Sequence, residues 1–384
     1  MRWDNLRIDS TSGSDGVRTP DGQATILPLI ERDAVVRTFD TPGFRGMTFY
    51  EVQAKSIVSR VPDASKVPFR WTINPYRGCQ HACKYCFARN THTYLDLDAG
   101  RDFDSKVVVK VNAPELLRAK LRSRGWTGEH IAMGTNVDCY QRAEGRYQLM
   151  RGVIAALRDA ANPFSILTKG TLILRDLDLL LEAAAVTDVG LNVSAGFVDA
   201  DLWRAIEPGT PAPQRRLDAC AALNDAGLRC GVLMGPIVPH LSDSPSQLEA
   251  AVRQAAAAGA THVSPIVLHL RPGAREWFLA WLREAHPTLV PRYGELYGRG
   301  AYARQEYRSR IAAEVRDLTE RYGVGRGDLL ADRVGRGGNA RGADQVRGAD
   351  QMRGAGQVRS ADEVRSASLA PGREAGVREQ LSLF

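Results

Sequence analysis

Between residues 68 and 270, short apolar runs alternate with longer amphipathic stretches. This pattern is typical of β-strands that are each followed by an α-helix in a parallel sheet. The predicted strands are Arg70–Ile73, Ile131–Gly134, Ser165–Thr168, Gly190–Ser194, Gly231–Met234 and Ser264–Leu268. The predicted helices are Pro114–Leu121, Tyr147–Ala160, Leu177–Ala185, Gln214–Ala226 and Gln247–Ala258. The alternation predicts an α/β fold, a partial (β/α)6 TIM-type barrel, with its functional groups at the C-terminal ends of the strands.

The flanking sequence differs from this pattern. The N-terminal part lacks periodicity, apart from a strand-like segment at Gly46–Val52, and predicts an irregular extension. Near the C-terminus an Arg/Gly/Ala-rich repeat has no aromatic residue with which to build a core, so we expect a disordered tail instead of a β-solenoid. The expected division is an N-terminal extension at 1–65, a barrel at 66–275, a helical extension at 276–331, a disordered linker at 332–379 and a terminal peptide at 380–384.

Composition narrows the class of protein. With 44% hydrophobic residues among 384, disorder throughout is excluded. The sequence has no run of eighteen apolar residues and begins with a polar stretch, so it predicts a cytoplasmic protein without a membrane span or secretory signal. A net charge of +7 is compatible with a polyanionic partner but is modest for this length.

Three of the six cysteines, Cys79, Cys83 and Cys86, fall within eight residues directly after a predicted strand. Such clustering in a reducing compartment indicates metal binding or catalysis. Thiolates at this spacing could bind three irons of a cubane iron–sulfur cluster and leave the fourth iron open to another ligand. The alternative is a zinc site completed by His81 or His92.

The cysteine loop, with an aromatic residue before its last cysteine, resembles the radical S-adenosylmethionine (SAM) superfamily. Residues 68–270 more closely resemble its spore photoproduct lyase-like, DNA repair photolyase group. The specific matches are Asn-Pro-Tyr-Arg-Gly-Cys at 74–79, Tyr-Gln-x2-Glu at 140–144, Leu-Thr-Lys-Gly-Thr-Leu-Ile-Leu-Arg-Asp at 167–176, Glu-Pro-Gly-Thr at 207–210 and Arg-Arg-Leu at 215–217. The flanks at 46–50 and 292–302 also resemble a bacterial subgroup of it.

This resemblance implies two cofactors. Cys79, Cys83 and Cys86 would hold a 4Fe-4S cluster, and SAM would chelate its remaining iron. Reductive cleavage of SAM would then release a 5′-deoxyadenosyl radical that abstracts a substrate hydrogen. An electron donor such as flavodoxin or ferredoxin would supply the reducing electron.

The resemblance also implies SAM contacts. Tyr85 would lie near the adenine, Asn136 and Asp138 would accept the ribose hydroxyls, and Lys169 would meet the carboxylate. The remaining expected contacts are Ser194, Glu207 and Arg216. The alternatives are loop packing for Tyr85, a solvated helix cap for Asn136 and Asp138, an exposed surface lysine for Lys169, and a structural salt bridge between Glu207 and Arg216.

One position departs from the group. Cys139 stands in Thr-Asn-Val-Asp-Cys-Tyr-Gln, where the group usually has a proline. Spore photoproduct lyase uses a nearby cysteine as a hydrogen donor, but that cysteine precedes the Asp motif. Cys139 is therefore a candidate catalytic hydrogen donor, with an inert packing thiol as the alternative. Cys220 and Cys230 are expected in the core.

The chain ends in a glutamine followed by apolar anchors, Gln380, Leu381, Ser382, Leu383 and Phe384. An apolar peptide at the end of a polar tether can dock into a partner's pocket. The segment resembles the peptide by which bacterial DNA polymerases and repair proteins bind the ring-shaped sliding clamp, although a random apolar end is the alternative.

The expected function is a radical SAM enzyme that acts on damaged DNA and is recruited to the sliding clamp. Arg77, Arg89 and Arg142 lie near the predicted active rim and could meet phosphates, although exposed arginines are usually solvated. A base in duplex DNA would have to be flipped out of the stack. The alternatives are a radical SAM enzyme that acts on RNA, protein or a small molecule, and a clamp-associated iron–sulfur protein without turnover.

Overall fold

A computed structural model describes residues 34–63, 65 and 67–325 of the chain. Its larger sheet has seven strands in the order β11-β10-β9-β8-β7-β4-β3. Six of them pair in parallel and in chain order, and β3 pairs antiparallel with β4 at one edge. Their bounds are β3 Val58–Arg60, β4 Trp71–Ile73, β7 Ile131–Met133, β8 Phe164–Thr168, β9 Val189–Ser194, β10 Cys230–Ile237 and β11 Val263–Val267. This order confirms the expected α/β fold, and each of the six predicted strands is present.

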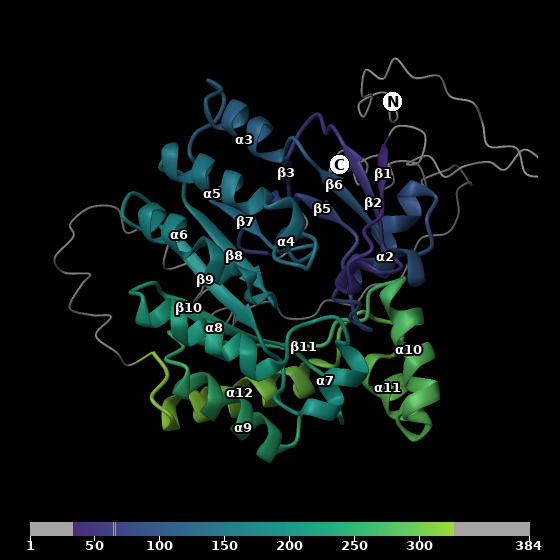
Figure 1. The fold of residues 1–384 in the computed structure, drawn as a ribbon. Coiled ribbons are helices and arrows are strands. Elements are labelled where there is room, and N and C mark those ends of the chain that lie inside the picture. The colour runs from purple at the N-terminus through teal and green to yellow at the C-terminus, as the bar shows by residue number, and fades with distance from the viewer. Residues whose placement is uncertain (1–33, 64, 66, 326–384) are drawn as a thin grey trace, which may run out of the picture.

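Helices connect the parallel strands and follow one another along the outer side of the sheet (Figure 1). They are α3 Ala113–Leu121, α5 Leu149–Asp159, α6 Leu177–Ala184, α8 Pro213–Asp225 and α9 Pro245–Ala257, close to the predicted ranges. In α5 the buried residues Met150, Val153, Ile154 and Leu157 repeat at helical spacing. The apolar face that the sequence shows is therefore the face that packs on the sheet.

A second sheet lies beside the barrel, with the order β1-β2-β6-β5. Its strands are β1 Val35–Arg37, β2 Thr48–Val52, β5 Tyr76–Arg77 and β6 Lys106–Lys110. Since β2 pairs with the distant strand β6, the N-terminal region expected to be an irregular extension instead supplies strands to both sheets. Local sequence could not show this, because the pairing joins segments far apart in the chain.

Short elements fill the loops around the barrel. They are η1 Pro42–Phe44, η2 Phe87–Leu95, α2 Arg101–Ser105, α4 Glu144–Tyr147, η3 Thr171–Asp176 and α7 Ala200–Ile206. After β11 come α10 Ala274–Ala285, η4 Pro287–Leu289, α11 Val290–Tyr297 and α12 Gln305–Arg321. Helix α12 packs on α9 and β11, and α10 contacts η2. The C-terminal helices therefore close one edge of the sheet and reach the segment that follows the cysteines.

None of the described helices is long and apolar enough to cross a membrane. The expected linker at 332–379 and the peptide Gln380–Phe384 lie outside the described residues.

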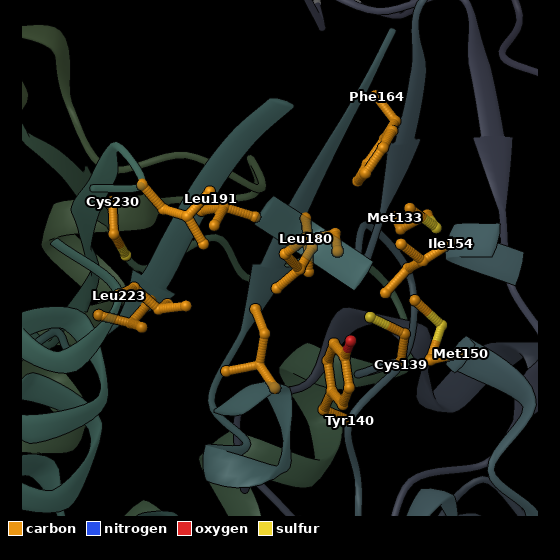
Figure 2. Packing of buried hydrophobic residues seen from close by; sticks show 14 of the residues in the cluster. Met133, Cys139, Tyr140, Met150, Ile154, Phe164, Leu180, Leu191, Leu223 and Cys230 are labelled. Carbon is orange, nitrogen blue, oxygen red and sulfur yellow. The ribbon is translucent and has the colours of Figure 1, made fainter. Parts of the chain in front are cut away.

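The main core lies between the sheet and its helices. It contains Phe164, Leu180 and Leu191, and it also holds Cys220 and Cys230, as expected for two packing thiols. Figure 2 shows Cys139 in the same cluster, beside Met150 and Tyr140. The strand ends above this core carry the loops described next.

Candidate active site

The cysteine loop begins directly after β5, at a position that requires glycine. Gly78 has a φ of +85°, and a Cβ there would lie 2.5 Å from the carbonyl oxygen of Lys106. Glycine alone adopts this conformation without strain and leaves room for β6. The amide of Cys79 then donates to the carbonyl of Phe103, which ties the start of the loop to α2.

Gln141 holds the backbone on both sides of Cys79. Its Nε2 donates to the carbonyl of Gly78, and its Oε1 accepts from the amide of Gln80, each at 3.0 Å. The Gln141 side chain is fully buried. Its place in the Tyr-Gln-x2-Glu motif was visible in the sequence, but its role was not, because the two bonds span more than sixty residues.

The loop that contains Gly209 supports the same segment from another direction. A Cβ at Gly209 would lie 1.9 Å from the carbonyl oxygen of Gln80, and the Gly209 amide donates to the carbonyl of His81. The amide of Lys84 donates to the carbonyl of Ile206. The glycine of the Glu-Pro-Gly-Thr motif is thus the residue that lets this loop press against the cysteine loop.

The three thiols lie close enough to influence one another. Cys79 and Cys83 are buried, and Cys86 is half-buried. Burial raises the pKa of Cys79, and the neighbouring Asp138, Cys86 and Cys83 raise it further. Burial likewise raises the pKa of Cys83 and of Cys86. Without a metal, these buried thiols resist ionisation. The positive irons of an iron–sulfur cluster would stabilise them as thiolates, so three neighbouring cysteine side chains suit such a cluster.

The two histidines of the zinc alternative have other partners. His92 Nε2 lies 2.8 Å from the carbonyl of Lys106, and its ring packs edge-on against Phe103. His81 Nδ1 lies 3.4 Å from Asp138 Oδ2. Within the described part of the chain, no group of three His, Cys, Asp or Glu side chains is placed to hold a single metal ion.

Lys169, Ser194 and Glu207 meet beside the cysteine loop. Lys169 and Ser194 lie at the ends of the neighbouring strands β8 and β9, and Glu207 directly follows α7. Lys169 Nζ donates to Ser194 Oγ at 2.6 Å and lies 3.9 Å from Glu207 Oε1. The ammonium also lies 5.9 Å from the centre of the Tyr85 ring. The structure therefore brings together four of the residues expected to contact SAM. Lys169 is mostly covered instead of being an exposed surface lysine.

Glu207 and Arg216 form a buried ion pair at the base of this group. Arg216 donates to Glu207 Oε2 at 2.5 Å and to the carbonyl of Ser194 at 3.1 Å. The hydroxyl of Tyr85 donates to Glu207 Oε1. Burial opposes ionisation of Glu207, but Arg216 and Lys169 outweigh it and lower the pKa of this carboxyl. Glu207 is thus a buried anion that orients Tyr85 as well as the two cations.

The carboxylate of Asp138 accepts hydrogen bonds from the loops around it. Its Oδ1 accepts from the amide of Tyr140 and the hydroxyl of Thr168, and its Oδ2 accepts from the amide of Lys169. These bonds join the ends of β7 and β8 and favour a positioning role over ribose binding. Asn136 is half-buried, and no hydrogen bond of its side chain occurs among the described residues.

Two of the three arginines expected near phosphates are buried, which corrects that expectation. Arg89 is fully buried and donates to the carbonyl of Cys83 and to the carboxylate of Asp104. Arg77 is buried in β5, where burial lowers its pKa to about 10. Arg142 is exposed and donates to the carbonyl of Gly43. Sequence alone could not separate a buried guanidinium from a solvated one.

Cys139 is fully buried among apolar side chains, and burial raises the pKa of its thiol well above the ordinary value. Its neighbours in the core cluster, Met150 among them, are packing residues (Figure 2). This position supports the packing alternative for Cys139 over the role of hydrogen donor.

Comparison with known proteins identifies the family. Residues 73–254 match the radical SAM superfamily. An uncharacterized protein of Mycobacterium tuberculosis is 48% identical over 322 residues, which are 84% of this chain and 93% of that protein. An uncharacterized protein of Methanocaldococcus jannaschii is 34% identical over 180 residues, which are 47% of this chain and 65% of that protein. The chain belongs to the radical SAM superfamily, whose cofactors are a 4Fe-4S cluster and SAM.

Among solved structures, the fold is similar to that of spore photoproduct lyase complexed with dinucleoside spore photoproduct. The TM-score is 0.55 at 16% sequence identity, and the match covers 72% of this chain and 80% of that chain. At this identity the likeness establishes a spore photoproduct lyase-like fold.

Proposed function

We propose that this radical SAM enzyme acts on damaged DNA in a photolyase-like or lyase-like repair reaction. The observation that carries the chemistry is the position of three neighbouring thiols next to the group of Lys169, Ser194 and Glu207. DNA as substrate is supported by the fold, which is shared with a lyase whose structure is complexed with a dinucleoside photoproduct. The net charge of +7 agrees with a polyanionic substrate.

We assign the cluster to Cys79, Cys83 and Cys86. The fit rests on their donor chemistry, on their mutual effect on pKa and on the nearby Gln80 side chain, which is buried without a hydrogen-bond partner among the described residues. With SAM bound, such a cluster supplies a 5′-deoxyadenosyl radical. The protein's contribution is to position both cofactors and to exclude water.

Lys169 is the residue that we assign to the SAM carboxylate. Its ammonium has three donors, of which one is used by Ser194 Oγ. Glu207 Oε1 lies 3.9 Å from the same ammonium, and Glu207 is itself neutralised by Arg216. A carboxylate that approaches Lys169 therefore meets a cation whose position is already fixed, and little side-chain entropy is lost on binding.

Tyr85 closes this side of the site. Its ring is about nine-tenths covered, and its hydroxyl is anchored to Glu207. The ring thereby lies beside Lys169, whose ammonium is 5.9 Å from the ring centre, and we assign it to packing against the adenine. We retain Asn136 as a candidate for the ribose hydroxyls and assign Asp138 to positioning.

The test is anaerobic reconstitution with iron and sulfide, reduction by dithionite, and measurement of 5′-deoxyadenosine. The wild type is compared with Lys169→Met, and Lys120→Met serves as a control that removes a lysine outside the site. Ultraviolet-irradiated DNA, undamaged DNA, RNA and protein are supplied in parallel. Turnover that depends on irradiated DNA supports the proposal, whereas turnover that depends only on another substrate contradicts it.

We also propose that Gln380–Phe384 recruits the enzyme to the bacterial sliding clamp. Its support is the sequence of the peptide and its position at the end of a long polar segment. Binding to purified clamp is measured for the full chain, for a chain that lacks the five residues, and for Ser366→Ala, a change in the expected linker, as a control. Deletion without loss of binding would contradict this part of the proposal.

A further inference from the structure

Directly after the cysteine loop begins a series of aromatic and cationic side chains that contact one another. Its members are Phe87, Arg271, His269, Tyr302 and Arg308, which we call the aromatic–cation stripe. Phe87 directly follows Cys86 in the chain. None of these five residues takes part in the group around Lys169.

Ring and charge contacts connect the stripe from one end to the other. The Arg271 guanidinium lies 5.4 Å from the centre of the Phe87 ring. His269 and Tyr302 pack edge-on, with ring centres 4.6 Å apart. The Arg308 guanidinium lies 5.7 Å from the Tyr302 ring. The amide of Leu270, which lies between His269 and Arg271 in the chain, donates to the carbonyl of Ala301, the residue before Tyr302, and this bond joins the two halves.

The stripe exposes aromatic surface that the fold does not use. Phe87 is 44% exposed and Tyr302 is 46% exposed, although large aromatic side chains are usually more covered than this. Exposed aromatic rings that have cations next to them are the combination on which proteins stack the bases of a nucleic acid strand.

The stripe is also positively charged. Neither Arg271 nor Arg308 forms an ion pair with a carboxylate of the described residues. Burial lowers the pKa of His269, and the two arginines lower it further, as expected where positive charge is not neutralised. A partner that fits must therefore offer planar rings together with negative charge.

We propose that single-stranded DNA binds along the aromatic–cation stripe, with bases stacked on Phe87 and Tyr302 and phosphates near Arg271 and Arg308. Nucleic acid strands combine a flat base with a phosphate at each step, and proteins bind them with stacked aromatic residues and cations. Since a damaged base has to leave the duplex stack to reach the cysteine loop, the stripe would hold the strand opened around it. This proposal rests on the proposed function, because it takes DNA as the substrate.

The test measures equilibrium binding of a fluorescein-labelled single-stranded DNA to the full reconstituted chain by anisotropy, at several salt concentrations. Duplex DNA and RNA of the same sequence are the comparison ligands. Tyr302→Leu and Arg271→Gln are the test variants, because neither residue belongs to the cysteine loop or to the group around Lys169. Arg146→Gln is the matched control, since it removes an exposed arginine that lies 4.3 Å from the ring of Phe39, on the side of the second sheet.

Tyr302→Leu is expected to weaken binding of single-stranded DNA about 5- to 140-fold, which corresponds to about 1–3 kcal/mol for a stacked base. Arg271→Gln is expected to lower the slope of log Kd against log salt by about 0.7, the value for one phosphate contact on a single strand. Arg146→Gln is expected to change neither quantity.

Two results would overturn the proposal. The first is that Tyr302→Leu and Arg271→Gln bind single-stranded DNA as tightly, and with the same salt slope, as Arg146→Gln. The second is that the two variants lose RNA binding while their DNA binding is unchanged. SAM cleavage with irradiated DNA is measured separately from binding of single-stranded DNA. If the stripe variants weaken DNA binding as expected but irradiated DNA supports no SAM cleavage, only the proposed function is contradicted. If irradiated DNA supports SAM cleavage but the stripe variants bind single-stranded DNA normally, only the stripe proposal is contradicted.

Discussion

Replacing Gln141 by leucine should loosen the cysteine loop without disturbing the rest of the barrel. The substitution removes both hydrogen bonds that flank Cys79, and it leaves the carbonyl of Gly78 and the amide of Gln80 buried and unpaired. Each unsatisfied group costs about 1–3 kcal/mol, so the folded loop should lose about 2–6 kcal/mol. Even the lower figure raises the population of an open loop by about 30-fold.

The assay is anaerobic reconstitution followed by a chelator challenge, with iron loss followed optically. Gln141→Leu should lose iron at least about 30-fold faster than the wild type if loss proceeds through the open loop. Urea unfolding of the same samples reports the cost to the whole fold.

Asn162→Leu is the matched control. Asn162 is a buried amide that donates to the carbonyls of Glu129 and Pro163 and accepts from the indole of Trp126, away from the cysteines. It should lose comparable stability in urea but retain iron as the wild type does. Equal iron retention by Gln141→Leu and Asn162→Leu would refute the reasoning, because the loss of two hydrogen bonds at the loop would then have no local effect.

Three further results are expected. Lys169→Met should weaken SAM binding at least about tenfold, since a hydrogen bond to a charged group contributes about 1.5–3 kcal/mol, and calorimetry at equal iron content measures it. Arg216→Met should cost about 3–5 kcal/mol in urea unfolding by leaving Glu207 buried as an unpaired charge, and adding Glu207→Gln should restore part of this loss. Burial lowers the pKa of His92 from 6.5 to about 4. Between these two values the unfolded chain binds a proton at His92 that the folded chain does not, so the contribution of His92 to the free energy of unfolding is present above pH 6.5 and is lost as the pH falls toward 4. Because burial also lowers the pKa of His81 to about 4, His92→Gln should lessen the fall of the urea midpoint across this window without abolishing it, and an unchanged pH profile would contradict the assignment.

Sequence reasoning was most successful where the signal is local. Apolar periodicity placed all six parallel strands, because each strand and helix buries the face that its own sequence makes apolar. Of the second sheet, the sequence indicated only the strand-like segment at Gly46–Val52, which forms β2. The sheet itself was missed, because β2 pairs with β6 across a long stretch of chain.

Within the site, spacing alone brought Cys79, Cys83 and Cys86 together, because three residues of one short loop cannot lie far apart. Folding decided which of their neighbours are buried. Arg89 looked like a free cation in the sequence but is enclosed by the carbonyl of Cys83 and the carboxylate of Asp104.

What the sequence determined by itself was therefore the barrel and the donor set of the cysteine loop, since both depend on residues near one another in the chain. Only the tertiary structure decided that Gln141 spans Cys79, that Glu207 pairs with Arg216, and that Cys139 faces the core. These outcomes depend on which loops meet at the ends of parallel strands. Which loops lie next to one another is set by the packing of segments that are distant in the chain, and no local sequence pattern encodes it.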